Sequence, residues 1–294
     1  LSEQLRETLT EATRLRLISD VPLGAFLSGG IDSSLVVALM TELTGGPVKT
    51  FSIGFREKAY DETSYAQLVA ERYRTDHYRE VVVPRPDEVI PRLAWHYDEP
   101  FADSSAIPTW YVSRHARRHV TVALTGDAGD ETFAGYNRYM AALLSLWIDR
   151  LGAPAKAVLR PQWLGAIPGS NEPRTILRRL KRFAYGLSLD MMERYLRWIG
   201  IFSEADKKAL YRPAFAQAVE GESSLSFLRR YYEECGHGDP VHRITYTDLM
   251  TYLPCDINTK VDIASMANSL ETRSPFLDHK LVELAGMIPI EHKL

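Results

Sequence analysis

Residues 26–34 read FLSGGIDSS, in which a short apolar run leads into two glycines, a single acid and several hydroxyl groups. Gly29 and Gly30 allow backbone amides to approach a phosphate closely, and the N-terminus of the helix expected after them favours anions. Three serines add neutral donors for phosphate oxygens: Ser28, Ser33 and Ser34. Asp32 would repel a phosphate, and a divalent cation between the two removes this conflict. The stretch therefore predicts a strand, a phosphate-binding loop and a helix, with a metal ion beside Asp32.

Two other phosphate-binding patterns do not fit this loop. The pattern G-x-x-x-x-G-K-[ST] needs a lysine that reaches the terminal phosphates, whereas GGPVKT at 45–50 has the wrong spacing and leads into a strand. The dinucleotide pattern G-x-G-x-x-G is missing as well. A structural alternative is that Asp32 and Ser33 only cap the helix, as such residues usually do.

The first 126 residues show strand and helix patterns in alternation. After a helix over 2–18, strands are expected at 25–27, 48–55, 77–83 and 120–126, with helices over 32–43, 61–73, 86–98 and 107–118. This order predicts an α/β fold, a parallel sheet with helices on both faces. After about residue 140 the strand signals fade and a helical pattern continues to the end. We therefore expect an α/β domain over 1–140 and a mostly helical region over 141–294.

A second acidic segment, LTGDAGDETFAGYNRY at 124–139, follows the fourth expected strand. Ligands of parallel sheets bind at the carboxyl ends of the strands, where this segment and the first loop both lie. At a separation of ~4 Å, Asp32 and Asp130 would repel each other by about 4 kcal/mol at an effective dielectric near 20, and a magnesium ion would turn that cost into binding. Asp32 and Asp130 are therefore the predicted metal ligands, which leaves Asp127 for another role. A structural alternative, with Asp127 as an N-cap and Asp130 in the first helical turn, explains this segment alone equally well.

Composition disfavours several classes of protein. The 294 residues include 35 basic and 38 acidic side chains, a net charge of −3, so no nucleic acid or anionic membrane is expected as a partner. The basic stretch RTILRRLKRF at 174–183 is better explained as a solvated helix face than as an RNA site. Cys235 and Cys255 support neither a disulfide framework nor a zinc site. With no signal-peptide pattern and no run of ~18 apolar residues, a cytoplasmic protein is expected.

The loop at 28–34 resembles the pyrophosphate-loop motif S-G-G-x-D-S-S of the adenine nucleotide α-hydrolase superfamily. Enzymes of that superfamily cleave ATP to AMP and pyrophosphate while they adenylate a substrate. The segments TGDAGDETFAGY at 125–136 and YLPCDINTKVDIASMANSLETRSPFLDHKLVELA at 252–285 further resemble the synthetase domain of glutamine-dependent asparagine synthetase. The resemblance implies an adenine nucleotide α-hydrolase-like fold in which residues 252–285 return to the active site.

This resemblance also implies an activity. The protein would use ATP and Mg²⁺ to adenylate the side-chain carboxylate of L-aspartate, and ammonia would then displace AMP to give L-asparagine. In the family, an N-terminal glutaminase domain with a cysteine nucleophile makes the ammonia. We read the chain, which begins at Leu1, as a piece of a longer protein without that domain, so free ammonia is the expected nitrogen source. The sequence leaves open whether the chain forms a homodimer.

Site residues follow from the same resemblance. The implied ATP-binding residues are Leu27, Ser28, Gly29, Gly30, Asp32, Ser33, Ser34, Ile53, Thr125 and Gly126. Among them, Leu27, Ile53 and Gly126 would flank adenosine, although Ile53 is equally well explained as sheet core. Asp127 would orient or deprotonate ammonia, with a shorter reach than the glutamate that many family members carry there.

Lys260 is the second implied catalytic residue, because a lysine at the α-phosphate and leaving pyrophosphate stabilises charge that grows in the transition state. Its structural alternative is a solvated surface lysine. Ile263 stands where relatives often have another basic residue. We expect Glu271 and Arg273 to form a structural pair and Cys255 to be a small buried side chain.

Residues 264–269 include several small side chains that suit a helix packed closely against another backbone. Pro275 is expected to stop that helix and Asp278 to cap the next one. Upstream, DEPFADSSAIPTWYVSR at 98–114 is expected to expose Asp98 and Asp103 near the nucleotide, without an assigned role.

Other functions use the same ATP-binding half. A β-lactam synthetase-like cyclase or another amidotransferase would keep it and change the acceptor carboxylate. A transfer-RNA-modifying enzyme with the same loop predicts a basic surface and reactive cysteines, which this composition does not favour. A non-catalytic adenylate-binding scaffold is disfavoured by the intact set of acids.

Overall fold

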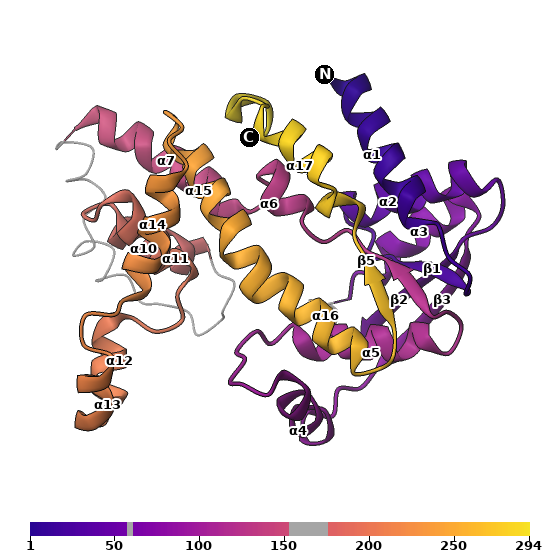
Figure 1. Cartoon of the computed structure of the whole chain (residues 1–294), viewed down its shortest axis with the longest axis horizontal. Helices are drawn as coiled ribbons and strands as arrows, with labels where there is room; N and C mark the ends of the chain where they lie inside the picture. The colour runs from indigo at the N-terminus through magenta and orange to yellow at the C-terminus, as the bar shows by residue number, and fades with distance from the viewer. Residues whose placement is uncertain (58–60, 153–175) are drawn as a thin grey trace. The chain divides into compact units, whose positions relative to one another are not determined.

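A computed structural model describes residues 1–57, 61–152 and 176–294 (Figure 1). These residues divide into two compact units. The sheet unit comprises residues 1–133 and 252–289, and the helical unit comprises residues 134–251 and 290–294. The division into domains at residue 140 stays a prediction, because compactness alone does not establish that a part folds by itself.

A five-stranded parallel sheet forms the centre of the sheet unit. Its strands are β1 (Leu23–Phe26), β2 (Lys49–Phe55), β3 (Asp76–Val82), β4 (Val122–Leu124) and β5 (Glu271–Arg273). They lie in the order β3-β2-β1-β4-β5, so the chain moves outward from β1 to β3 and then returns to the other side of β1. The strand order therefore reverses between β1 and β4, which is where parallel sheets bind ligands.

Helices cover both faces of this sheet, as the sequence predicts. Phe51 of β2 packs against Ala116 of α5 (Ala106–Arg117) on one face. Successive side chains of a strand point to opposite faces. On the other face, a Cβ at Gly54 would lie 2.9 Å from Thr63, at the start of α3 (Thr63–Tyr73). Helices α5 and α3 therefore lie against opposite faces of β2, in keeping with the nearly continuous burial of this strand.

The remaining helices of the sheet unit flank these elements. They are α1 (Ser2–Arg16), α2 (Ile31–Thr44), α4 (Pro86–Tyr97), α6 (Gly129–Phe133), the π-helical segment η2 (Leu253–Asn258), α16 (Thr259–Met266), the 3₁₀ turn η3 (Pro275–Leu277) and α17 (His279–Gly286). Asp278 caps α17 by accepting a hydrogen bond from the Lys280 amide, 3.0 Å away.

The region after residue 140 is mostly helical, as expected, except that residues 271–273 form β5 and pair with β4 at the edge of the sheet. The expectation for Pro275 was wrong, because this residue does not stop the preceding helix. That helix ends at Met266, and Ser269 follows with a φ of 57°, while the Leu270 amide bonds back to the Ser265 carbonyl at 3.1 Å.

Arg273 ties this returning segment to α1. Its side chain donates to Glu271 at 2.6 Å, the pair that the sequence predicts, and also to the carbonyls of Arg16 at 3.0 Å and Ile18 at 2.7 Å. Arg16 in turn pairs with Asp278 at 2.5 Å. The edge strand is thus fixed by side chains as well as by the sheet ladder.

The helical unit is built from α7 (Asn137–Leu151), α10 (Ile176–Gly186), α11 (Met191–Ile199), α12 (Glu204–Leu210), α13 (Pro213–Ala218), α14 (Ser224–Glu234), α15 (Pro240–Met250) and the 3₁₀ turn η4 (Ile290–His292). Its apolar core includes the fully buried Tyr139, Tyr195 and Ile244. Asp248 is also fully buried and accepts hydrogen bonds from Arg138, at 2.8 Å, and from the hydroxyls of Tyr139 and Tyr195.

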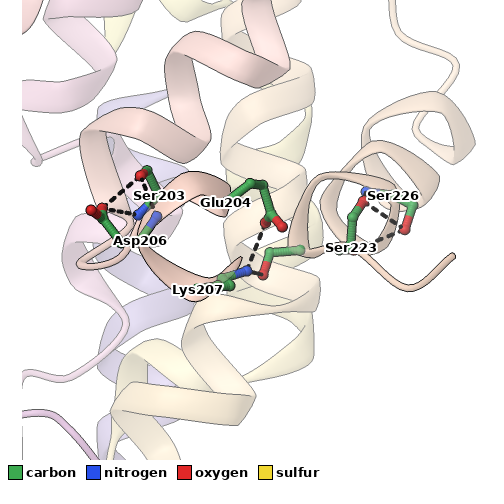
Figure 2. A network of polar contacts seen from close by, with 7 residues as sticks. Ser203, Glu204, Asp206, Lys207, Ser223 and Ser226 are labelled. Carbon is green, nitrogen blue, oxygen red and sulfur yellow. Dashed lines mark hydrogen bonds and ion pairs between the residues drawn. The ribbon is translucent and has the colours of Figure 1, made fainter. Parts of the chain in front are cut away.

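Polar caps fix the outer helices of this unit. Ser203 and Asp206 form a capping box at the start of α12. Figure 2 shows Lys207 of the same helix bonded to Glu204, at 2.7 Å. Lys207 also donates to the Ser224 hydroxyl at 2.7 Å, which joins α12 to α14.

The basic stretch at 174–183 lies partly outside the described residues. Within its described part, Arg182 of α10 donates to the Trp198 carbonyl at 2.6 Å, near the end of α11. Among the described helices, none combines the length and the apolar character needed to cross a membrane.

Candidate active site

The loop after β1 leads directly into the N-terminus of α2. Gly29 has a φ of 84°, and a Cβ there would lie 2.5 Å from the backbone of Tyr65 and Ala66, so only glycine fits. The Ser28 hydroxyl accepts from the Gly30 amide at 3.2 Å and lies 3.0 Å from the Ser33 hydroxyl. Ser28 and Gly30 are exposed. The loop thus presents backbone amides and hydroxyls at the first turn of a 14-residue helix, a suitable site for phosphate.

The capping alternative for this loop was wrong. Gly30 is the N-cap of α2 and makes no side-chain capping bond, while Asp32 lies inside the first turn. The Ser33 hydroxyl donates to the Gly30 carbonyl at 3.2 Å. Asp32 is therefore not needed to begin the helix.

The segment after β4 meets this loop at close range. A Cβ on Gly126 would lie 2.8 Å from the Ser33 nitrogen, and a Cβ on Gly129 would lie 2.4 to 2.8 Å from the Asp32 carboxyl group. Gly126 is therefore required for the close approach of the two backbones, whereas a side chain at Gly129 would displace the Asp32 carboxyl group. The structure brings together Asp32 and the segment 125–130 at the point where the strand order reverses.

Negative charge accumulates at this contact. Burial, together with the nearby charges of Asp130 and Asp127, raises the pKa of Asp32 to about 6. Burial also raises the pKa of Asp127, against the opposing effects of a hydrogen bond from Thr125 and the charge of Lys260. Asp130 lies in the first turn of α6. The three carboxylates thus form an anionic cluster.

The donor set fits a magnesium ion shared with phosphates. In the part of the chain that the structure describes, no group of three or more His, Cys, Asp or Glu side chains forms a site that could hold a metal alone. Magnesium, however, is usually bound by one or two carboxylates together with water and substrate phosphates. Asp32 and Asp130 would supply such a pair, and the raised pKa of Asp32 indicates that a cation would relieve local repulsion.

Lys260 is buried in α16, so the alternative of a solvated surface lysine was wrong. Its ammonium group lies 3.0 Å from the Asp103 carboxylate. Asp103 itself accepts from the Ser105 amide and hydroxyl, at 2.8 and 2.7 Å. Although burial raises it, these hydrogen bonds and the Lys260 charge hold the pKa of Asp103 below its usual value.

The sequence does not reveal that Asp103 pairs with Lys260. Before α5, Asp103 closes a local turn by accepting a hydrogen bond from the Ser105 amide. The partner Lys260 is 157 residues away in sequence, and nothing local indicates it. Asp98 is exposed as expected, whereas Asp103 is half-buried.

A pocket of about 250 Å³ opens beside the loop and is lined by two of the three predicted adenosine contacts, Leu27 and Ile53. Ser28 lines it as well, together with Thr109 and Val112 of α5. The Leu27 amide is bonded to the Phe51 carbonyl at 2.9 Å, which fixes the wall of the pocket. Gly126 instead packs against Ser33, and Thr125 is buried with its hydroxyl on Asp127. Ser34 is half-buried in the first turn of α2.

The returning segment fixes the acidic loop from behind. The Thr125 amide donates to the Arg273 carbonyl at 2.9 Å, and the Ser274 hydroxyl donates to the Asp127 carbonyl at 2.6 Å.

Two further residues of the returning segment are not part of these bonds. Ile263 packs on the apolar cluster around Tyr97. The expectation for Cys255 was wrong, because this residue is exposed in the π-helical segment, where its side chain fills no core space.

The sequence is similar to those of known proteins. A family model described as asparagine synthase matches residues 4–294. The whole chain is 33% identical to asparagine synthetase [glutamine-hydrolyzing] 1 of Bacillus subtilis and covers 44% of that protein. A 142-residue part, 48% of the chain, is 48% identical to 27% of a putative asparagine synthetase [glutamine-hydrolyzing] 2 of Methanocaldococcus jannaschii. The chain is also 25% identical, over its full length, to 47% of amidase chry2 of Gibberella zeae. The chain thus spans less than half the length of each of these relatives.

Proposed function

Because the chain belongs to the asparagine synthase family, we propose that it binds ATP with magnesium, adenylates the side-chain carboxylate of L-aspartate and transfers ammonia to give L-asparagine. The observation that carries this proposal is the contact between the Asp32 carboxyl group and Gly129. It joins the phosphate-binding loop to the acidic segment at the reversal of strand order, the expected position of a nucleotide.

In this proposal the loop and the start of α2 hold the phosphates. The amides at Gly29 and Gly30 and the hydroxyls of Ser28, Ser33 and Ser34 would bind the pyrophosphate portion. Leu27 and Ile53 would contact the adenosine from the adjoining pocket. Asp32 and Asp130 would hold magnesium, which when bound offsets the phosphate charge.

Two side chains would act on the reacting groups. Lys260 would stabilise the charge that develops on the α-phosphate and on the departing pyrophosphate. Ammonia would then form a bond to the acyl carbon while the bond from that carbon to the AMP oxygen breaks. Asp127 would accept the proton that nitrogen loses, since its raised pKa makes it a stronger base than an ordinary aspartate.

The source of nitrogen belongs to the proposal as well. The relatives from Bacillus subtilis and Methanocaldococcus jannaschii are both named glutamine-hydrolyzing, and each is longer than this chain. In a longer protein, a glutaminase region would supply the ammonia. For the 294-residue chain, ammonium in solution is the appropriate substrate.

The test is a pyrophosphate-release assay with ATP, magnesium and ammonium across a panel of carboxylates. We expect release that depends on L-aspartate, with one asparagine formed per pyrophosphate. Asp32→Asn serves as the control for background ATP hydrolysis and should lose at least about 100-fold, because the charge-neutral side chain no longer holds the metal. Aspartate-independent release in both proteins would contradict the proposal.

A second candidate is an amide-forming enzyme with another acceptor carboxylate. One relative, from Gibberella zeae, carries a name other than asparagine synthetase, amidase chry2. Ile263 also places an apolar side chain where the family resemblance implies a basic residue in many relatives. Pyrophosphate release only with a peptide or a β-amino acid would favour a cyclase-like, amide-forming reaction over asparagine synthesis.

A further inference from the structure

The ion pair between Lys260 and Asp103 joins two distant parts of the sheet unit. The ammonium nitrogen lies 3.0 Å from Oδ2 of Asp103, and only 11% and 20% of the two side chains are exposed. Lysine is normally a solvated residue on a flexible four-carbon stem. This burial and pairing therefore restrict its ammonium group to one region.

The carboxylate end of the pair is held rigidly. Oδ1 of Asp103 accepts from the Ser105 amide at 2.8 Å and from the Ser105 hydroxyl at 2.7 Å. These bonds form a turn that leads directly into α5. Asp103 therefore cannot follow a moving lysine without losing its hydrogen bonds to Ser105.

The lysine end is fixed through its backbone. The Tyr97 hydroxyl donates to the Lys260 carbonyl at 3.1 Å, and the Tyr97 ring stacks on Phe101 with 4.3 Å between centroids. Helix α16 also contacts α5, where the Asn268 side chain donates to the Trp110 carbonyl at 3.3 Å. Both ends of the ion pair therefore rest on elements that pack against each other.

The charge of Lys260 also acts on one member of the acidic cluster. Burial raises the pKa of Asp127, and the charge of Lys260 opposes this effect. Lys260 therefore interacts with two carboxylates, with Asp103 through the ion pair and with Asp127, which is assigned to the reaction.

We propose that Asp103 is a positioning residue that holds the Lys260 ammonium group within reach of the ATP phosphates. The inference rests on the proposed function, because Lys260 acts on phosphate charge only there. A donor that is already oriented before the reaction needs no reorganisation as charge develops, and this favours the transition state over bound ATP.

Asp103→Asn tests the proposal, because it removes the charge and retains the shape. We expect kcat to fall about 10- to 100-fold, with the KM for ATP within about threefold of the original. Asp103→Glu should restore at least a tenth of the lost activity, since it returns the carboxylate. Asp98→Asn is the matched control, an exposed acid of the same loop, and should leave kcat unchanged.

A double-mutant cycle separates positioning from general damage. If Asp103 acts through Lys260, Asp103→Asn should cause no further loss in a Lys260→Gln background. Multiplied losses in the double variant, or an unchanged kcat in Asp103→Asn, would overturn the proposal.

A readout independent of activity keeps the proposal testable if asparagine synthesis itself fails. Amine acetylation followed by mass spectrometry measures how fast Lys260 reacts in each folded protein, with folding checked by circular dichroism. We expect at least fivefold faster labelling of Lys260 in Asp103→Asn and an unchanged rate in Asp98→Asn. Equal rates in all three proteins would show that Asp103 does not restrain the lysine. Absence of pyrophosphate release in the unmodified chain would count against the proposed function alone.

Discussion

Two independent features require glycine at position 29, and they can be separated. Its φ of 84° disfavours any L side chain, and a Cβ would meet the backbone at the start of α3 at 2.5 Å. Gly45 shares the first feature, with a φ of 64°, but has nothing within 4 Å of its Cβ direction. Comparison of the two positions therefore isolates the cost of the close approach.

Gly29→Ala should lower the free energy of unfolding by about 2–4 kcal/mol, the sum of left-handed strain and steric overlap. Gly45→Ala should cost about 1 kcal/mol, because strain acts alone there. Urea denaturation followed by circular dichroism measures both values. Equal losses in the two variants would mean that the loop can move away from α3.

Charge at Asp32 should act against stability in the absence of ligand. Its pKa is raised to about 6, first by burial and then by Asp130 and Asp127, so the ionised group costs free energy near pH 7. Asp32→Asn should therefore stabilise the metal-free chain by on the order of 1 kcal/mol, a value reduced for partial solvent screening. Thermal unfolding in EDTA checks this. A lower melting temperature for Asp32→Asn would indicate that the carboxylate is stabilising, contrary to the assigned metal role.

At the scale of elements, His77 links β3 to β2 through both ring nitrogens. Nδ1 lies 2.8 Å from the Thr50 hydroxyl and Nε2 lies 3.1 Å from the Ser52 hydroxyl. Burial, and to a smaller extent the charges of Arg79 and His115, lower the pKa of His77. The unfolded chain therefore takes up a proton at a higher pH than the folded chain does.

The sign of the pH effect follows from this difference. Stability should be retained above the unfolded value of about 6.5 and should decline as the pH falls from there through the lower folded value. In His77→Gln, the loss of unfolding free energy between pH 7.5 and 5.5 should be smaller by up to about 1 kcal/mol. Urea midpoints at the two pH values measure it. An equal loss in both proteins would show that His77 does not cause the dependence.

Elements differ in how well their sequence predicts them. Strands β1 to β4 and the helices between them are long enough, or flanked clearly enough, for apolar periodicity to indicate them. Strand β5 has three residues and no recognisable period, and it exists because β4 offers an unpaired edge. Helix α16 ends at Met266 and not at Pro275, because the backbone turns and bonds back on itself around Ser269. The apolar pattern of the sequence does not indicate this turn.

The candidate site divides in the same way. The contact of Asp32 with the segment after β4 could be predicted, because both motifs follow neighbouring strands and parallel sheets bind ligands at the carboxyl ends of their strands. This prediction needs no knowledge of how individual side chains pack. The pairing of Asp103 with Lys260 depends on how α16 packs against α5, and no local pattern encodes it. Cys255 was misjudged because hydrophobic character predicts burial only on average.

At the scale of the whole molecule, the residues assigned to ATP and magnesium belong to one unit although they are far apart in sequence. Asp32, Asp130 and Lys260 lie in the sheet unit, which residues 252–289 complete. The helical unit has its own buried polar centre at Asp248. Nucleotide binding and the stability of the helical unit should therefore respond to different substitutions.

Asp248→Ala should destabilise the helical unit by about 3–5 kcal/mol, because it leaves the Arg138 charge and two tyrosine hydroxyls without their buried acceptor. Ser203→Ala, which removes only a helix cap in the same unit, should cost about 1 kcal/mol. Ligand that binds only folded protein at 100 times its dissociation constant stabilises by about 2.7 kcal/mol. Calorimetry with and without ATP and magnesium should show that this gain persists in Asp248→Ala, since the nucleotide residues lie in the sheet unit. Loss of the gain in Asp248→Ala, with the sheet unit still folded, would mean that the helical unit takes part in nucleotide binding.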